Sequence, residues 1–402
     1  VIHLKTFTLY AGVLMTPIFA NRVLLPVGRK AADAVSGAIS KSLNEKSISA
    51  LVPATKGESL GNKYETALDV SVPCQIESGL IVCTSGSTGN PKAVEISAEA
   101  LLAATNLVNS KFENPASWLL AINPAFIGGA MVIARAIAQD QKWEYGLDDD
   151  GKFSPEIFAG IAQTFIAKNG RVRTSLVAAQ LSSLIAQDRI ELLTKFDAVL
   201  VGGGQISPEI YNNLINQGVN LIRTYGMTET SGGVVWDGKT LGEVKLRIEN
   251  PANGGAGRIS INSPSNATCY HGNSEGIKKL NQITFNNGWV MTQDIGTYEN
   301  ATLKVIGRSD DIVVSGGVNV SVHAVENVLR DQEGVEDAVV FAMPDKTWGT
   351  IIAAVIVGNA DLLKLQDAVE KELGSPAKPR VIKFAHELPL LPNGKIDVDS
   401  LK

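Results

Sequence analysis

Residues 80–92 read Leu-Ile-Val-Cys-Thr84-Ser85-Gly86-Ser87-Thr88-Gly89-Asn-Pro-Lys92, and this stretch decides how the rest of the chain is interpreted. The apolar run at its start predicts a buried strand. Glycines let backbone N–H groups turn toward one point, hydroxyls add donors and Lys92 adds positive charge, so the loop can hold a polyphosphate. A flexible surface loop is the alternative. The GxxxxGK[ST] pattern is missing, which disfavours P-loop kinases and ATPases.

Outward from this loop, short apolar runs alternate with helical segments. A serine followed by proline predicts helix starts at Ser154 and Ser207, and Ser97 is expected to cap a helix from Ala98 to about Asn109. The expected strands between these helices are 119–122, 175–177, 198–201 and 219–222. This alternation predicts a largely parallel sheet covered by helices.

The pattern changes after Gly232. Short β-like segments separated by Gly, Pro and Asn predict a β-rich subdomain at about 233–306. Two amphipathic helices, near 322–330 and 362–373, with apolar strands around them predict a small α+β unit. We therefore expect an α/β protein with a large N-terminal domain, 1–309, and a small C-terminal domain, 310–402.

Composition excludes several classes of protein. The 402 residues carry 36 Lys plus Arg and 41 Asp plus Glu, a net charge of −5, which argues against a general nucleic-acid binder. With 45% hydrophobic and 19% charged residues, the chain is not disordered. Its 3 cysteines form no CxxC pair and its 4 histidines form no HExxH, so we expect neither a disulfide framework nor a structural zinc site, nor a metal held by histidines.

Two apolar stretches are candidates for a membrane-spanning helix or a signal peptide. Residues 118–133 are interrupted by Asn123 and Pro124 and fall short of the ~20 residues of a spanning helix, so a buried strand and helix are expected. Residues 7–20 faintly resemble a signal-peptide core, but Tyr10, Gly12 and Pro17 weaken that likeness. We expect no membrane association.

Five motifs in a fixed order resemble those of the adenylate-forming superfamily, which contains acyl- and aryl-CoA ligases, adenylation domains and luciferases. They are Thr84–Lys92, Tyr225-Gly226-Met227-Thr228-Glu229-Thr230, Thr292-Gln293-Asp294, Gly307-Arg308-Ser309-Asp310-Asp311 with Ser315-Gly316-Gly317, and Pro392-Asn393-Gly394-Lys395. Gln293 departs from the family's usual glycine, a change we expect to be tolerated.

The resemblance implies how ATP is bound. The loop at Thr84–Lys92 would hold the β- and γ-phosphates, and Glu229 would ligate Mg²⁺, which takes oxygen ligands. Thr228 would hydrogen-bond the α-phosphate, and Tyr225 would stack on adenine. The remaining residues assigned to the nucleotide are Gly203 and Gly204, which let the base approach the backbone, Gly226 and Met227 beside Tyr225, and Asp294, which would bind the ribose with Arg308 beside it.

The resemblance also implies a moving C-terminal domain. Lys395 would bridge the substrate carboxylate and the α-phosphate during adenylation. Asp310 is the expected hinge, about which the small domain rotates after adenylation. Ser315, Gly316 and Gly317 would then line the path of the CoA thiol.

Several stretches resemble the o-succinylbenzoate–CoA ligases within this superfamily. They are Thr174-Ser175-Leu176-Val177 with Gln180-Leu181, Val201-Gly202-Gly203-Gly204, Tyr225–Gly233, Trp236–Leu241 and the helix ending at Arg135. The acyl pocket is expected at Phe126, Gly128, Ser175 and Gln180. Phe126 replaces that family's histidine and Ala179 its proline, and Phe126 could instead be a plain core residue.

The expected function is therefore that of an AMP-forming acid–CoA ligase, with o-succinylbenzoate of menaquinone biosynthesis as substrate. ATP, Mg²⁺, CoA and a small carboxylic acid are the expected cofactor and partners, the expected location is the cytoplasm, and a homodimer is one option for the oligomeric state. The alternatives are another aryl or acyl acid, transfer to a carrier protein, and a catalytically silent adenylate-binding relative.

Overall fold

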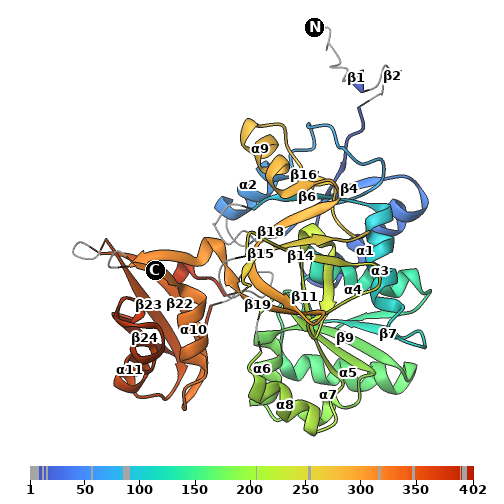
Figure 1. The fold of residues 1–402 in the computed structure, drawn as a ribbon. Helices are drawn as coiled ribbons and strands as arrows, with labels where there is room; N and C mark the ends of the chain where they lie inside the picture. Colours follow the sequence, from blue (N-terminus) through green and yellow to red (C-terminus); the bar gives the residue numbers. More distant parts are fainter. Residues whose placement is uncertain are drawn as a thin grey trace.

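The computed structural model describes residues 9–10, 13–14, 17–55, 58–84, 91–204, 206–251, 255–315, 318–345, 349–389, 391 and 396–402. Three sheets and their helices form the larger body, and a smaller lobe carries the C-terminal residues (Figure 1). Near the N-terminus, β1 (Leu9–Tyr10) and β2 (Val13–Leu14) pair as a short antiparallel ladder. Most of residues 7–16 lies outside the described residues, and with it most of the segment that faintly resembles a signal peptide.

A seven-stranded sheet in the order β13-β12-β11-β10-β9-β7-β8 forms the centre of the larger body. Its five strands from β8 to β11 pair in parallel, whereas β12 and β13 join antiparallel. The strands are β7 (Ser117–Leu120), β8 (Trp143–Tyr145), β9 (Val172–Val177), β10 (Ala198–Gly202), β11 (Leu221–Met227), β12 (Gly232–Trp236) and β13 (Lys239–Thr240). The expected largely parallel sheet is confirmed.

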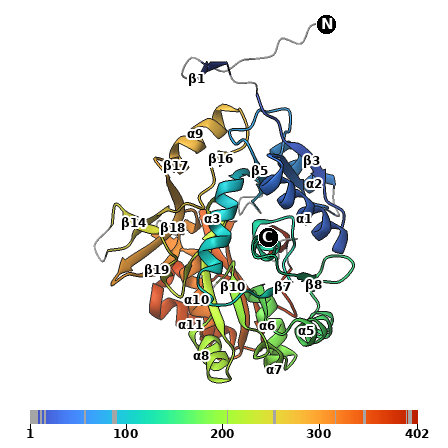
Figure 2. The ribbon, with the colours of Figure 1, turned by 90° about the vertical axis from the view of Figure 1, so that its right-hand side faces the viewer.

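Successive side chains of this sheet enter two different cores. Trp118 and Leu120 of β7 pack into the core on one face, and Leu119 packs into the core on the other, as the period of two along a strand requires. The helices α5 (Pro155–Asn169), α6 (Ala178–Ala186), α7 (Ile190–Leu193) and α8 (Pro208–Asn216) cover the second face (Figure 2). Ser154 and Ser207 accept hydrogen bonds from the amides three residues on, so both predicted caps are confirmed.

The first face packs against helices that a second sheet covers in turn. That sheet has the order β16-β6-β5-β4-β3 and is parallel only among β3, β4 and β5. Its strands are β3 (Asn21–Leu24), β4 (Ile48–Val52), β5 (Gly79–Cys83), β6 (Ala93–Ser97) and β16 (Cys269–Tyr270), and its helices are α1 (Arg29–Asn44), α2 (Glu58–Ala67), α3 (Ala98–Asn109) and α4 (Ile127–Ala138). The predicted strand before the loop and the helix capped by Ser97 are both confirmed.

A third sheet, antiparallel throughout, completes the larger body. It contains β14 (Lys245–Glu249), β15 (Gly257–Asn262), β17 (Phe285–Asn286), β18 (Trp289–Glu299) and β19 (Thr302–Arg308), with α9 (Glu275–Thr284) beside it. The β-rich texture expected at 233–306 is thus shared among three sheets, because β12 and β13 extend the first sheet and β16 extends the second.

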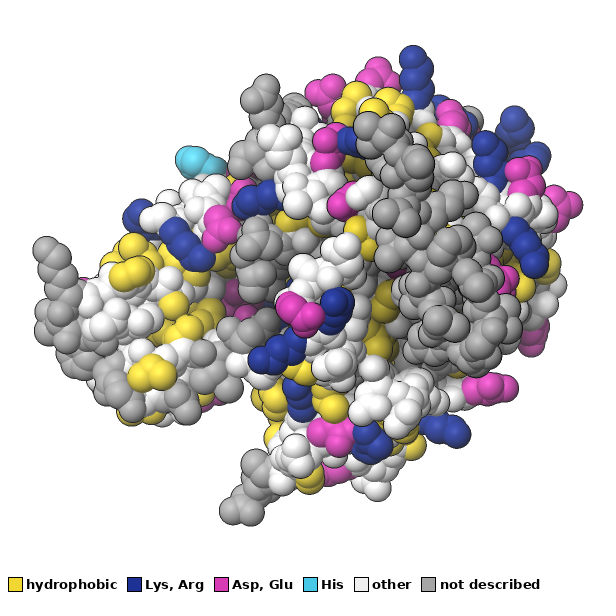
Figure 3. All heavy atoms as spheres, turned by 90° about the horizontal axis from the view of Figure 1, so that it is seen from above, with side chains coloured by type: hydrophobic (Ala, Val, Ile, Leu, Met, Phe, Trp, Pro, Cys, Tyr) yellow, Lys and Arg dark blue, Asp and Glu magenta, His cyan; other side chains and the backbone are white. Residues whose placement is uncertain are grey.

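The smaller lobe has its own hydrophobic core. The sheet β22 (Val335–Asp345), β23 (Gly349–Gly358) and β24 (Val381–Ala385) packs against α10 (Val322–Arg330) and α11 (Leu362–Leu373), with β20 (Ile312–Ser315) and β21 (Val318–Ser321) beside it. Both predicted helices of this region are confirmed. Seen from above, hydrophobic side chains gather on this lobe (Figure 3). Among the described residues, no helix has the length and apolar character needed to cross a membrane.

Because the two bodies have separate cores, replacing Ile352 with Ala should destabilise the smaller lobe alone. Ile352 is fully buried in the α10–β23 core, and such truncations cost about 2–5 kcal/mol. Calorimetry should show one unfolding transition shifted to lower temperature. The matched control Leu119→Ala, on the central sheet, should move a different transition. A single transition moved equally by both variants would contradict separate cores.

Candidate functional site

The predicted phosphate loop lies at the tip of the β5–β6 hairpin. Its two ends are joined, since the Thr84 amide donates to the Lys92 carbonyl at 2.7 Å and the Lys92 amide donates to the Thr84 hydroxyl at 3.1 Å. Ser85, Gly86, Ser87, Thr88 and Gly89 lie outside the described residues. A hairpin carries this loop where a P-loop would lead into a helix, so the structure agrees with the exclusion of the P-loop class.

The predicted metal ligand, Glu229, is linked through Tyr270 to Lys92, just before β6. Tyr270 of β16 donates its hydroxyl to Glu229 Oε1 at 2.6 Å, and Lys92 Nζ lies 5.3 Å from the centre of the Tyr270 ring. Burial and the adjacent Glu229 raise the pKa of Tyr270, so the phenol keeps its proton and remains a donor. Among the described residues, no other hydrogen bond reaches the Glu229 carboxylate, and the residue as a whole is buried. A carboxylate with one free oxygen near a lysine fits Mg²⁺ bound together with substrate phosphates.

A second buried carboxylate links three predicted nucleotide residues. Tyr225 of β11 donates its hydroxyl to Asp294 Oδ2 at 2.6 Å, and Arg308 Nη1 lies 3.2 Å from Asp294 Oδ1. Burial, and then the Asp294 charge, raise the pKa of Tyr225 well above its ordinary value. The pairing of β18 with β19 sets Asp294 opposite Arg308. Sequence reasoning placed Asp294 and Arg308 at the ribose and Tyr225 at the adenine, and the structure joins all three through the Asp294 carboxylate.

The turn that carries Thr228 and Glu229 is a short 3₁₀ segment between β11 and β12. Gly226 permits it, because a Cβ on Gly226 would lie 2.0 Å from the Gly232 carbonyl oxygen. The turn is also tied to the chain after β15, since the Ala267 amide donates to the Glu229 carbonyl and Ser265 donates its hydroxyl to the Thr230 carbonyl. Met227, the last residue of β11, donates its amide to the Thr230 hydroxyl.

The triple glycine ends β10 beside β11. Gly203 has a φ of +76°, and a Cβ on Gly202 would lie 2.6 Å from the Thr224 hydroxyl. Gly204 follows in the turn that leads toward α8. A turn at the carboxyl end of a central parallel strand is where open α/β sheets bind ligands.

The residues expected at the hinge and the thiol path are only partly described. Asp310 lies in the 3₁₀ turn Ser309–Asp311, and Ser315 is buried at the end of β20. Gly316, Gly317 and Lys395 lie outside the described residues. Gln293, the departure from the family glycine, accepts the Ser309 hydroxyl at its backbone and side-chain oxygens. It therefore fastens the start of the turn that contains Asp310.

Of the residues expected to line the acyl pocket, Phe126, Ser175 and Gln180 are buried around α4 and β9, and Gly128 is partly buried. Phe126 packs edge-on against Tyr64 in the core, its ring centre 6.1 Å away. The Gln180 amide is engaged, because Nε2 donates to the Ala121 carbonyl and Oε1 accepts the Val177 amide. Gly128 lies in the first turn of α4, and a Cβ there would make only ordinary contacts. Phe126 and Gln180 therefore have structural partners of their own.

Arg135, at the other end of α4, lies next to Ser175 of the expected acyl pocket. It is unusual because it is a buried arginine without an acidic partner among the described residues. It is 7% exposed, no described carboxylate pairs with it, and its Nε has no hydrogen-bond partner. Nη1 lies 3.5 Å from the Ser175 hydroxyl, and Nη2 lies 3.9 Å from where a Cβ on Gly232 would be. Burial lowers the pKa of Arg135 to about 10. A buried guanidinium without a counter-ion is costly, so the arrangement is suited to an anionic ligand.

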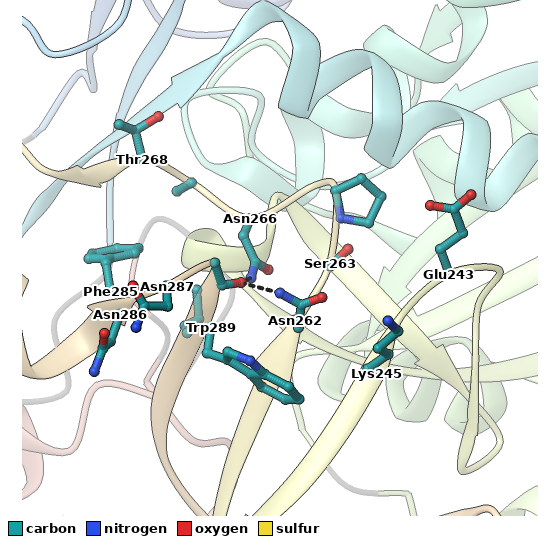
Figure 4. Close-up of a pocket in the computed structure, with 14 residues that line it drawn as sticks. Glu243, Lys245, Asn262, Ser263, Asn266, Thr268, Phe285, Asn286, Asn287 and Trp289 are labelled. Atoms are coloured by element: carbon teal, nitrogen blue, oxygen red, sulfur yellow. Dashed lines mark hydrogen bonds between the residues drawn. The ribbon is translucent and has the colours of Figure 1, made fainter.

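A separate cavity of about 780 Å³ lies on the third sheet (Figure 4). Polar side chains of Asn262, Asn266 and Lys245 line it together with Trp289. None of the predicted site residues lines this cavity, so it carries no part of the expected chemistry.

Sequence reasoning missed Tyr270, which holds Glu229, and did not weigh Arg135 as a ligand-binding residue. Tyr270 lies in no motif and reaches Glu229 only because β16 pairs with β6. Arg135 ends an apolar run of the sequence. A charged residue in a helix that is expected to be buried predicts a buried charge, and the sequence contained this signal.

Comparisons with known proteins show the family to which this chain belongs. The chain matches the AMP-binding enzyme family over residues 62–271 and the AMP-binding enzyme C-terminal domain over residues 324–395. This chain belongs to the AMP-binding enzyme family. Its resemblance to the adenylate-forming superfamily is thereby confirmed.

Several curated relatives and solved structures are similar to this AMP-binding enzyme. A probable 2-succinylbenzoate–CoA ligase of Mycobacterium tuberculosis is 33% identical over 82% of this chain and 85% of the relative. The 2-succinylbenzoate–CoA ligase of Listeria monocytogenes is 28% identical over 80% and 69%. The amide bond synthetase McbA of Marinactinospora thermotolerans has a TM-score of 0.76 at 20% identity, covering 96% of this chain and 90% of that one.

The o-succinylbenzoate CoA synthetase MenE of Bacillus subtilis, in complex with its acyl-adenylate intermediate OSB-AMP, has a TM-score of 0.69 at 21% identity. It covers 95% of this chain and 88% of that chain. At such identities the structural likeness establishes the fold, and the expected α/β class is confirmed.

Replacing Tyr225 with Phe should lower the free energy of unfolding by about 1–3 kcal/mol, because the buried Asp294 loses its phenol donor. Denaturant unfolding of the ligand-free protein measures the loss. Tyr298→Phe is the matched control: its hydroxyl has no hydrogen bond to a described residue, and the expected change is below about 0.5 kcal/mol. Equal stability of the Tyr225 variant and wild type would show that the Asp294 contact contributes nothing.

Proposed function

We propose that this AMP-binding enzyme is an AMP-forming acid–CoA ligase whose acid is 2-succinylbenzoate. The observation that carries the proposal is the pair of buried carboxylates at one end of β11. Glu229 is held by Tyr270 near Lys92, and Asp294 is held by Tyr225 and Arg308. Such an arrangement suits a nucleotide with its phosphates toward the β5–β6 hairpin and its ribose toward β18.

The reaction has two steps that both gather negative charge. In the first, a carboxylate oxygen attacks the α-phosphorus of ATP and pyrophosphate leaves; in the second, the CoA sulfur attacks the acyl carbon and AMP leaves. Bound Mg²⁺ would neutralise phosphate charge. Glu229 would hold that ion, Lys92 would contact the outer phosphates, and Thr228 would donate to the α-phosphate. The Tyr225 and Tyr270 phenols each donate a hydrogen bond to one carboxylate and remain neutral themselves.

The smaller lobe is proposed to supply a different group to each step. Lys395 would stabilise the first transition state, and rotation about Asp310 would then bring Ser315 to Gly317 to the thiol path. The separate core of the lobe supports movement as a unit. ATP and CoA are cytoplasmic metabolites, so we place the protein in the cytoplasm.

The identity of the acid rests on the relatives and on Arg135. The curated relatives are named 2-succinylbenzoate–CoA ligases. That acid carries two carboxylates, of which one is activated and the other must be accommodated in the pocket. Arg135 is the buried cation without a carboxylate partner among the described residues, and it lies beside Ser175 and Gly232. We assign it the carboxylate that does not react.

Mass spectrometry with ATP, Mg²⁺, CoA and a panel of acids tests the function directly. Formation of 2-succinylbenzoyl-CoA with an equal amount of AMP supports the proposal. A different thioester would mean that the enzyme activates another acid by the same chemistry. AMP without thioester would indicate a carrier-protein acceptor. Absence of AMP with every acid would overturn the assignment as a ligase.

Replacing Lys395 with Ala should lower the rate of acyl-AMP formation by about 10²–10³-fold, because a preorganised cation is lost from the first transition state. Thioester formation from supplied acyl-AMP should stay close to wild type. Lys383→Ala, an exposed lysine of β24, is the control and should affect neither step. Equal loss of both half-reactions would contradict the two-conformation mechanism.

Replacing Arg135 with Met should lower kcat/KM for 2-succinylbenzoate by roughly 100-fold or more, since a desolvated charge pair is broken. The rate with benzoate, which lacks the second carboxylate, should fall far less. The control is Arg173→Met, another buried arginine, which pairs with Asp197. It should reduce stability and leave the ratio between the two acids unchanged. Parallel losses with both acids in the Arg135 variant would remove Arg135 from the acid site.

A further inference from the structure

A cluster of metal-binding side chains lies behind Tyr270, outside the nucleotide site. Donor atoms of Cys74, Glu95 and His271 all lie within 4.8 Å of one another. The three residues come from the segment after α2, from β6 and from the residue after β16. We refer to them, together with the neighbouring Cys269 of β16, as the Cys74 cluster.

The histidine of this cluster is oriented as metal ligands are. His271 Nε2 lies 2.9 Å from the Asp69 carbonyl oxygen, which leaves Nδ1 directed at Glu95 Oε1 at 2.7 Å. A backbone carbonyl on the far ring nitrogen is a common device for fixing a ligating imidazole. The Gln75 amide donates to Glu95 Oε2 at 2.7 Å and so fixes the carboxylate as well. The His271 and Glu95 side chains are 0% and 1% exposed.

We propose that Cys74, Glu95 and His271 bind a Zn²⁺ ion, with Cys269 as the fourth ligand. Thiolate, imidazole and carboxylate together select zinc over the hard Mg²⁺, and four protein donors make a closed structural site. Cys269 is paired with Glu95 across the β16–β6 ladder, so the two side chains lie on the same face of the sheet. On binding, Zn²⁺ displaces the thiol protons and the proton between His271 Nδ1 and Glu95 Oε1. Cys74 is half-buried and provides the side from which the ion enters.

The chain lacks the CxxC and HExxH spacings, and for that reason the sequence argued against a zinc site. The fold assembles this cluster from strands that are distant in sequence, because β16 crosses the chain to pair with β6. Tyr270 stands between Cys269 and His271 and donates to Glu229. A bound ion would therefore hold the strand that positions Glu229. The zinc site is independent of the acid that the enzyme activates.

Metal analysis of the full-length protein tests the site without reference to activity. Wild-type protein kept reduced, equilibrated with Zn²⁺ and gel-filtered should retain about one ion per chain, measured by plasma mass spectrometry. Co²⁺ in place of Zn²⁺ should give cobalt–thiolate charge-transfer absorption, a readout that needs no variant.

Cys74→Ser should weaken Zn²⁺ at least about tenfold in competition with a chromophoric chelator. The matched control is Cys83→Ser, a buried cysteine of β5 outside the cluster, which should bind Zn²⁺ as wild type does. Folded wild-type protein that retains no Zn²⁺ and shows no cobalt–thiolate band would overturn the proposal. Equal affinity of the two serine variants would overturn it too.

Discussion

The close contact of two backbones, at Gly226 on β11 and Gly232 on β12, is the constraint on which the site depends. No side chain fits between these strands, since a Cβ on Gly226 would lie 2.0 Å from the facing carbonyl oxygen. The chain must therefore reverse tightly after Met227, and Thr228 and Glu229 occupy that reversal. With a wider turn, Glu229 would not meet Tyr270 from the neighbouring sheet.

Two tyrosines solve the same electrostatic problem at two places. A buried carboxylate needs hydrogen bonds, and a phenol supplies one without adding a formal charge to the site. A phenol whose pKa is raised by burial donates one hydrogen bond and contributes no charge. Asp294 and Glu229 thus each accept a hydrogen bond from a neutral donor, and the second oxygen of Asp294 faces Arg308.

Much of the fold could be read from local signals. Serine–proline caps, the strand before the glycine-rich loop and the two amphipathic helices of the smaller lobe depend on neighbours in sequence, and each lies where it was expected. The sheet to which a strand belongs could not be predicted in this way. The β12 and β16 sequences resemble the short strands of the third sheet, but β12 pairs in the first sheet and β16 in the second. For the same reason the sequence could propose Tyr225, Glu229 and Asp294 through ordered motifs but not Tyr270 or Arg135. Their partners are set by pairing and burial over long separations.

The two hydrogen bonds between Thr84 and Lys92 have a consequence for sequence variation among related chains. Reciprocal hydrogen bonds at the base of the β5–β6 hairpin close the ladder before residues 85–90 begin. The β5–β6 pairing is complete without these residues. Substitutions or length changes between Thr84 and Lys92 should therefore have little effect on folding. Selection on those positions is then largely separated from selection on stability.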